Sequence, residues 1–198
     1  HSTAGNGVAW NGIRFITVGS GTNTIAHSTD GNAAATFTGL GTSIFSTQGN
    51  AVAWNGTRWV AVGQGTNTIA HCIDTGSAVT FVGIGTSIFS TAGRGVCWAG
   101  SQWIAVGNGT NTYATSSDGV TWSGGGAGPF STQGNAVAWN GSVAVAVGQG
   151  TNTIAYSTNS GSTWTGIGTS IFSTSGNSIA WNGTHWIAGG SGTNTTAY

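Results

Sequence analysis

The stretch NAVAWNGTRWVAVGQGTN, residues 50–67, contains two short apolar runs separated by Asn-Gly and closed by a second Gly-rich turn. Within each run, large side chains alternate with small or polar ones. That period of two is typical of a β-strand and not of a helix. The stretch therefore predicts two consecutive strands, one that ends at Trp54 and one that begins near Arg58, with a tight turn between them.

This pattern recurs five times in the 198 residues, and each copy continues through Gly-Thr-Asn-Thr into two further short runs. The tryptophans that end the first run are spaced 44, 44, 41 and 42 residues apart: Trp10, Trp54, Trp98, Trp139 and Trp181. Four strands in about 42 residues is the size of a β-propeller blade. We predict an all-β fold, a five-bladed β-propeller made of five tandem 41–44-residue repeats. Residues 1–198 would form one domain, with blades at about 5–47, 48–91, 92–132, 133–174 and 175–198.

Two structural alternatives differ in what they require of the sequence. Helical repeats of this length would need Gly-poor segments, and the 37 glycines exclude them. A β-solenoid stays open as an alternative. The fifth copy reaches Tyr198 in its third run. If the strands of a blade are ordered from the axis outward, the last blade lacks its outer strand, and we expect self-association through that incomplete blade.

The segment between the third and fourth runs carries a motif. Ser116-Ser-Asp-Gly-Val-Thr-Trp122 and Ser157-Thr-Asn-Ser-Gly-Ser-Thr-Trp164 resemble the Asp-box, or BNR, repeat, Ser-x-Asp-x-Gly-x-x-Trp. The resemblance implies a sialidase-like propeller in which the motif occupies a turn between strands. It gives a structural role to the residues at the Asp position, because a short side chain there can bond backbone N–H groups of its own turn. These residues are Asp30, Asp74, Asp118 and Asn159.

Charged residues are scarce: three Arg, three Asp, no Lys and no Glu. Nucleic-acid binding needs more cations, so we expect no nucleic-acid partner, and no apolar stretch is long enough for membrane insertion. Sialidase and other glycosidase chemistry needs free carboxylates, and all three Asp lie in the turn motif, so we expect no enzymatic activity. We also expect no cofactor and no metal site, because His-x-His and Cys-x-x-Cys spacings are absent. Cys72 and Cys97 occupy different repeat positions, which argues against a disulfide.

The aromatic residues supply the candidate binding site. We interpret the first set of tryptophans, which end the first run, as core residues between blades. The second set is Phe15, Trp59, Trp103 and Trp186, and the fourth copy has Ala144 there. A buried position would not readily tolerate Ala, so this set is predicted to be partly exposed. The alternative, in which Trp59 and its equivalents only cover the strands below, stays open. Aromatic faces beside amides bind neutral sugars, which gives as candidate ligand-binding residues Trp59, Trp103, Trp186, Asn67, Asn111 and Asn152.

The sequence therefore predicts a non-enzymatic binding module that recognises neutral carbohydrate at several equivalent sites, so that weak sites add by avidity. The alternative is a structural or surface-display propeller, in a virion, filament or extracellular assembly, with no small-molecule ligand. No targeting signal is visible, and we expect an extracellular or surface-associated location, on a virion or otherwise.

Overall fold

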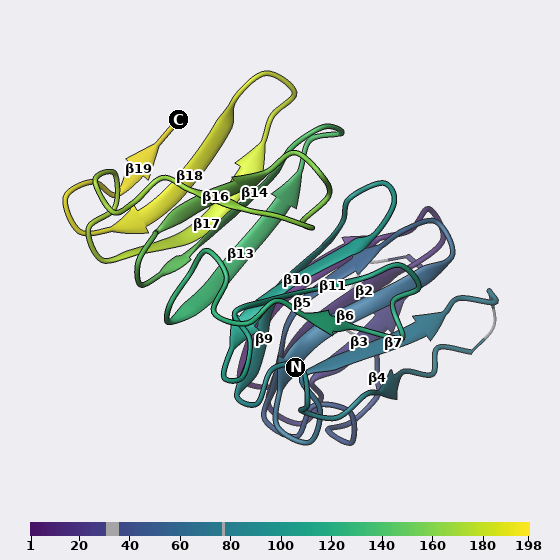
Figure 1. Ribbon diagram of the computed structural model, residues 1–198. Coiled ribbons are helices and arrows are strands. Elements are labelled where there is room, and N and C mark those ends of the chain that lie inside the picture. The colour runs from purple at the N-terminus through teal and green to yellow at the C-terminus, as the bar shows by residue number, and fades with distance from the viewer. Residues whose placement is uncertain (31–35, 77) are drawn as a thin grey trace.

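The computed structural model describes residues 1–30, 36–76 and 78–198. These residues form nineteen β-strands in five units (Figure 1). Unit 1 contains β1 (Ala4–Trp10), β2 (Phe15–Ser20), β3 (Ile25–Ser28) and β4 (Thr38–Gly39). Unit 2 contains β5 (Gln48–Trp54), β6 (Arg58–Gln64), β7 (Ile69–Ile73) and β8 (Val82–Gly83). Unit 3 contains β9 (Ala92–Trp98), β10 (Trp103–Asn108), β11 (Tyr113–Ser116) and β12 (Ser123–Gly124). Unit 4 contains β13 (Gln133–Trp139), β14 (Ala144–Gln149), β15 (Ile154–Ser157) and β16 (Thr165–Gly166), and unit 5 contains β17 (Ser175–Trp181), β18 (Trp186–Ser191) and β19 (Thr196–Ala197).

Every unit is an antiparallel meander in which each strand pairs with the next along the chain. The first and second strands pair over their whole length, so that Trp54 lies opposite Trp59 and Trp98 opposite Trp103. The first strands of successive units contact one another, which places them together at the inner edge of the units. The all-β prediction, with strands in the order of the runs, is confirmed.

A β-bulge interrupts the first strand of every unit at the same place. The extra residue is Asn6, Asn50, Arg94, Asn135 or Asn177, and each follows a glycine. The neighbouring unit lies close to that glycine: a Cβ on Gly93 would lie 2.5 Å from the carbonyl oxygen of Thr68. A bulge twists the strand and turns one side chain out of the ladder. The bulge residues are therefore directed by the backbone to one region of the fold.

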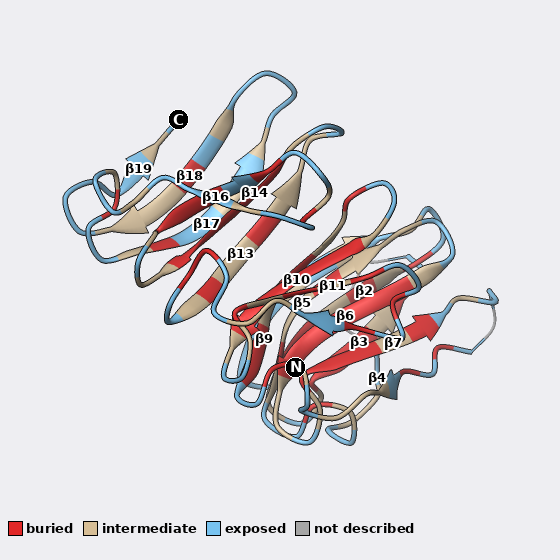
Figure 2. Ribbon diagram, viewed as in Figure 1, coloured by how far each residue is buried: buried red, intermediate tan, exposed pale blue. Residues whose placement is uncertain are grey.

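The core lies between the units, because one sheet face of each unit packs on the opposite face of the next. Ile16, Val18 and Ile25 of unit 1 cluster with Val52, Trp59 and Ala61 of unit 2, and the other neighbouring pairs repeat this arrangement. Figure 2 shows the buried residues concentrated in these contacting strands, while β18 and β19 are mostly half-buried or exposed. Burial of about four such apolar faces is the dominant stabilising term.

The two outermost faces of the array are open to solvent. Val8 of β1 is 62% exposed, although its equivalents Val52 and Val96 are 9% and 7% exposed. Ile187 of β18 is 43% exposed, whereas the equivalent Ile104 is fully buried. Figure 1 shows β13–β19 at the upper left and β1–β12 at the lower right of one continuous series. The structure thus shows propeller-type units packed in series.

No helix in the described ranges is long and apolar enough to cross a membrane.

Candidate functional site

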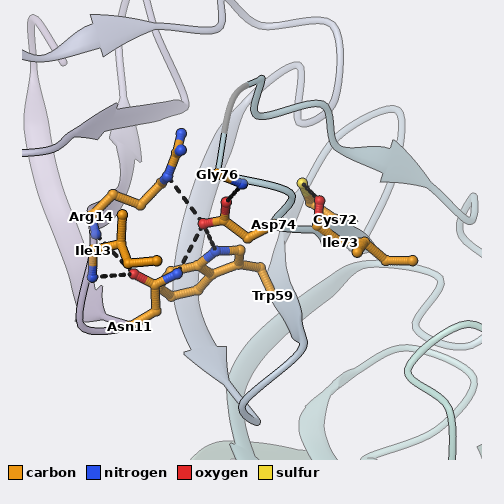
Figure 3. A network of polar contacts seen from close by, with 8 residues as sticks. All are labelled: Asn11, Ile13, Arg14, Trp59, Cys72, Ile73, Asp74 and Gly76. Atoms are coloured by element: carbon orange, nitrogen blue, oxygen red, sulfur yellow. Dashed lines mark hydrogen bonds and ion pairs between the residues drawn. The ribbon is translucent and has the colours of Figure 1, made fainter.

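The Asp-box turn of unit 2 carries a buried polar network that reaches unit 1 (Figure 3). Arg14 lies with its Nε 3.0 Å from Oδ2 of Asp74, and the two side chains are only 2% and 3% exposed. The Arg14 N–H is not aligned for a hydrogen bond, so the contact is an ion pair. Asn11 and Trp59 donate to the same Oδ2 at 2.8 and 3.2 Å, and the Gly76 N–H donates to Oδ1 at 2.9 Å. The carboxylate therefore joins two units.

The pKa of Asp74 reflects opposing causes. Burial raises it, whereas the hydrogen bonds from Gly76 and Trp59, the charge of Arg14 and the bond from Asn11 lower it, and the pKa is lowered overall. In unit 3, the N–H groups of Val120 and Thr121 each donate to Asp118 at 2.8 Å, and they lower the pKa of Asp118 to about 2.

The other two residues at the Asp position are also bonded within their turns. Ser28 donates to Asp30 at 3.1 Å. Asn159 accepts from the Thr163 N–H at 2.9 Å and from Ser157 at 2.9 Å. These bonds hold the two turns in shape.

The partial exposure predicted for Trp59 and Trp103 is wrong, because both are fully buried. They lie in second strands, which have a strand on each side and a neighbouring unit on the sheet face, so no edge is left open. Trp186 is half-buried and lines an apolar pocket of about 290 Å³ between units 4 and 5. The second aromatic set therefore does not form a series of sugar platforms.

The side chains of the three asparagines predicted with this set form hydrogen bonds with backbone groups. Asn67 donates from Nδ2 to the Ile44 carbonyl at 2.7 Å and accepts from the Gly85 N–H at 2.8 Å. Asn111 and Asn152 make the same two bonds in units 3 and 4. Each joins the Gly-Thr-Asn-Thr turn to the segment after the fourth strand of its own unit and to the segment after the fourth strand of the preceding unit.

The first aromatic set both packs on the core and reaches solvent. Trp54, Trp98 and Trp139 pack against the clusters between units, as predicted, but none of the five is fully buried. Trp10 is 46% exposed, and Trp54, Trp98, Trp139 and Trp181 are half-buried. Most of them stack on the second-set ring opposite, with centroids 4.8 Å apart for Trp54 and Trp59. These side chains lie at the C-terminal ends of the first strands, and each indole is partly accessible to solvent.

An Asn-Gly turn follows the indole in units 1, 2, 4 and 5, and in unit 1 the NH₂ group of Asn11 is already bonded to Asp74. In unit 2, Oδ1 of Asn55 accepts from the N–H groups of Thr57 and Arg58 at 3.0 and 2.8 Å. Asn140 and Asn182 make the equivalent bonds in units 4 and 5. These bonds use the carbonyl oxygen of the side chain and leave its NH₂ group as a free donor in the described structure. Unit 3 has Ala99 at this position and lacks the amide.

A second site lies at the opposite end of the first strands. The bulge residues of units 2 to 5 line a pocket of about 390 Å³ together with two residues that precede bulges; the lining residues are Asn50, Arg94, Gln133, Asn135, Ser175 and Asn177. All six are polar, and Arg94 is the only charged one. Sequence reasoning missed this site. The available signal was a glycine before the same position of every first run, which marks a bulge, and the departure from Asn to Arg in one copy.

Metal-binding and thiol chemistry have little support in the described ranges. They contain no group of three or more His, Cys, Asp or Glu side chains placed to hold a metal ion. Cys72 and Cys97 are both free. Burial raises the pKa of the Cys97 thiol to about 12, although the residue as a whole is only half-buried. Such a thiol is a poor nucleophile at neutral pH.

Comparison with known proteins supports the fold and is silent on the sites. No protein-family model matches the chain, and no curated protein matches it. The designed protein Ika8 is similar in structure, with a TM-score of 0.67 and 12% identity over 96% of this chain. The chain spans only 56% of that protein's length. A chain of the nidogen/laminin complex is similar with a TM-score of 0.67 and 10% identity, over 94% of this chain and 72% of that chain. YCF48 from Cyanidioschyzon merolae is similar with a TM-score of 0.61 and 12% identity, over 98% of this chain and 70% of that chain.

The likeness to these structures and the serial packing of antiparallel meanders together indicate a β-propeller-type fold. At 10–12% identity the likeness concerns the fold alone.

Proposed function

We propose that the protein is a non-enzymatic, multivalent binding module for neutral carbohydrate. The ligand sites are the half-buried indoles of the first aromatic set with the amide that follows them: Trp54 with Asn55, Trp139 with Asn140, and Trp181 with Asn182. This replaces the second aromatic set, whose members in units 2 and 3 are buried.

The observation that carries the proposal is the repetition of one partly exposed indole followed in sequence by an Asn whose NH₂ group makes no hydrogen bond in the described structure. The flat C–H face of a neutral sugar stacks on an aromatic ring, and an amide donates to a hydroxyl oxygen. A single shallow site of this kind is weak. Several of them on one rigid array act together, so a branched or polymeric glycan gains affinity by avidity.

We expect the protein to bind members of an array of neutral glycans, and we expect the triple variant Trp54→Ala, Trp139→Ala, Trp181→Ala to lose that binding. Trp98→Ala is the matched control, because unit 3 has the indole without the amide, and it should retain binding. Retained binding in the triple variant, with an unchanged circular dichroism spectrum, would rule out these residues. If the wild-type protein binds none of the neutral glycans on the array, the proposed function is ruled out.

A structural or surface-display role is the second candidate, and the exposed apolar residues on the outermost faces favour it. Val8, Trp10 and Ile187 belong to faces that are buried wherever two units meet. Closure of the five units into a five-bladed ring, with the last blade lacking its outer strand, would cover the same residues. Self-association through that last unit is the other way to cover them. Both stay predictions.

Hydrogen exchange separates these arrangements. For isolated chains in the open series, we expect exchange to be fast in residues 186–198 and in β1, and slowest in β5, β9 and β13, since terminal units have one neighbour and central units have two. Ring closure would slow exchange in β1 independently of protein concentration. Self-association would slow it only as the concentration rises.

A further inference from the structure

We infer that the pocket at the bulge end of the first strands binds a small oxyanion, a carboxylate, sulfate or phosphate group, through the guanidinium of Arg94. This inference is independent of the carbohydrate sites, which lie at the other end of the same strands. In β9, Ala92 and Trp98 are six residue steps apart, roughly 20 Å at about 3.3 Å per residue.

The first argument is that Arg94 lacks the hydrogen bond by which other bulge residues join their unit to the next one. Asn6, Asn50 and Asn135 donate from Nδ2 to the carbonyl oxygen of the glycine before the next unit's bulge, at 2.9, 2.7 and 2.8 Å. Arg94 makes no such bond in the described structure. Its Nε donates instead to Oδ1 of Asn108 at 3.3 Å. Unit 3 has therefore exchanged a structural amide for a cation at the point where four units meet.

The second argument is that the surroundings of Arg94 changed with it. In units 2 and 4 a glutamine, Gln48 or Gln133, donates to the bulge asparagine at 2.8 Å. Unit 3 has the small Ala92 at that position, which leaves room for the longer side chain. Asn108, which accepts from Arg94, stands where units 2 and 4 have Gln. Three positions that meet in space thus differ together from both flanking units.

The third argument is charge. No acidic residue lies among the pocket residues, and the described structure has one ion pair, Arg14 with Asp74. Asp30, Asp74 and Asp118 all follow third strands, which run parallel to the first strands, so they lie at the indole end. The guanidinium therefore has no counter-charge near it. A half-buried cation in this position favours an anion.

The remaining groups in the pocket are donors that an oxyanion can use. Asn50 and Asn135 each donate one side-chain N–H to a carbonyl oxygen of the neighbouring unit, and Gln133 donates one to Asn135. The second N–H of each amide is therefore available as a donor to a ligand. The planar guanidinium presents parallel N–H groups that match two oxygens of a carboxylate or phosphate. The pocket volume of about 390 Å³ is large enough for a small organic anion.

The test is titration of the ¹⁵N-labelled protein with sodium sulfate and, separately, sodium malonate, with ionic strength held constant by sodium chloride. We expect saturable shifts of the Gly93, Gly134 and Arg94 resonances with at least one of the two anions. The anion that binds more tightly identifies a tetrahedral oxyanion or a carboxylate as the natural group. Shifts that stay linear in both titrations would overturn the inference.

Arg94→Asn is the decisive variant, because Asn is the residue that the other four copies carry and the change restores the inter-unit tie. We expect it to fold and to raise the Kd by about tenfold or more, the loss of charge-assisted hydrogen bonds. Arg94→Lys should give an intermediate Kd, because the ammonium group keeps the positive charge but lacks the parallel N–H groups of the guanidinium. Arg58→Gln removes a cation at the indole end and should leave the Kd unchanged. An equal Kd in Arg94→Asn and wild type would exclude Arg94 as the ligand-binding group.

Discussion

Replacement of Arg14 by alanine is expected to lower the free energy of unfolding by about 3 kcal/mol or more, the effect of leaving a buried charge without its partner. The Asp74 carboxylate is 3% exposed and keeps its bonds from Asn11, Trp59 and Gly76 when the guanidinium is gone. Those bonds limit the loss, but they do not neutralise the charge. Urea-induced unfolding followed by tryptophan fluorescence measures the change.

Arg58→Ala is the matched control, because Arg58 occupies the same repeat position in unit 2. Arg58 is half-buried, bonds the His71 ring at 2.8 Å and makes no ion pair in the described structure, so we expect a loss below about 1 kcal/mol. Similar losses in the two variants would show that the Arg14–Asp74 ion pair does not stabilise the contact between units 1 and 2.

The Asp74 carboxylate, through the hydrogen bonds from Gly76 and Trp59 and the charge of Arg14, makes the stability depend on pH in a defined direction. The pKa of Asp74 is lowered in the folded protein, so the unfolded state binds a proton more readily. The stability that Asp74 contributes is therefore fully present above the unfolded pKa of about 3.9 and is lost as the pH falls through the lower folded value. Asp118, with a folded pKa of about 2, acts in the same direction. Arg14→Ala should consequently reduce the loss of stability between pH 5 and pH 2 that wild type shows.

Replacement of Trp103 by alanine is expected to cost about 3–5 kcal/mol, the range for removing a fully buried Trp. Its side chain is 0% exposed and packs with Val60, Val62 and Phe89 between units 2 and 3. Its Nε1 has no hydrogen-bond partner, so the loss is one of packing and of the cavity left behind. Thermal unfolding measured by circular dichroism reports the change.

Trp98→Ala is the comparison, because Trp98 lies opposite Trp103 in the register and stacks on it at 5.3 Å. Since Trp98 is half-buried, its removal should cost less than half as much. A larger loss in Trp98→Ala than in Trp103→Ala would contradict the assignment of the second aromatic set to the core.

Unit 4 shows how a buried position can carry Ala144. Tyr113 of unit 3 is half-buried and packs against the core cluster that contains Ala144, and it stands where units 1, 2 and 4 have Ile. The Tyr113 ring packs on Trp164 at 6.1 Å in an edge-on arrangement. A smaller residue on one face is thus accompanied by a larger one on the facing unit, and Ala144 is itself fully buried. The inference from Ala144 to exposure failed because interiors conserve packed volume over a cluster and not at each position.

The sequence by itself determined the strands, their order and the turns between them. Alternation of large and small side chains, with Gly and Asn at fixed places, depends on a period of two and on local backbone chemistry, so it can be read from one copy and checked in the others. The turn role of Asp118 has the same local origin, since its carboxylate bonds the N–H groups of its own turn.

Only the tertiary structure decided which aromatic set is buried and which polar residues meet. Trp54 and Trp59 are cross-strand partners on one sheet face, and their local patterns are alike. They differ because β5 pairs along its length only with β6 and meets β2 at the single Ser20–Gln48 bridge, whereas β6 pairs along its length with both β5 and β7 and has a unit across its face. Likewise Asn50, Arg94, Asn135 and Asn177 are some 40 residues apart in sequence, and they share a pocket because the bulges and the serial packing of units bring them together. Burial and pocket formation depend on contacts between distant segments, which a periodic pattern in one chain does not encode.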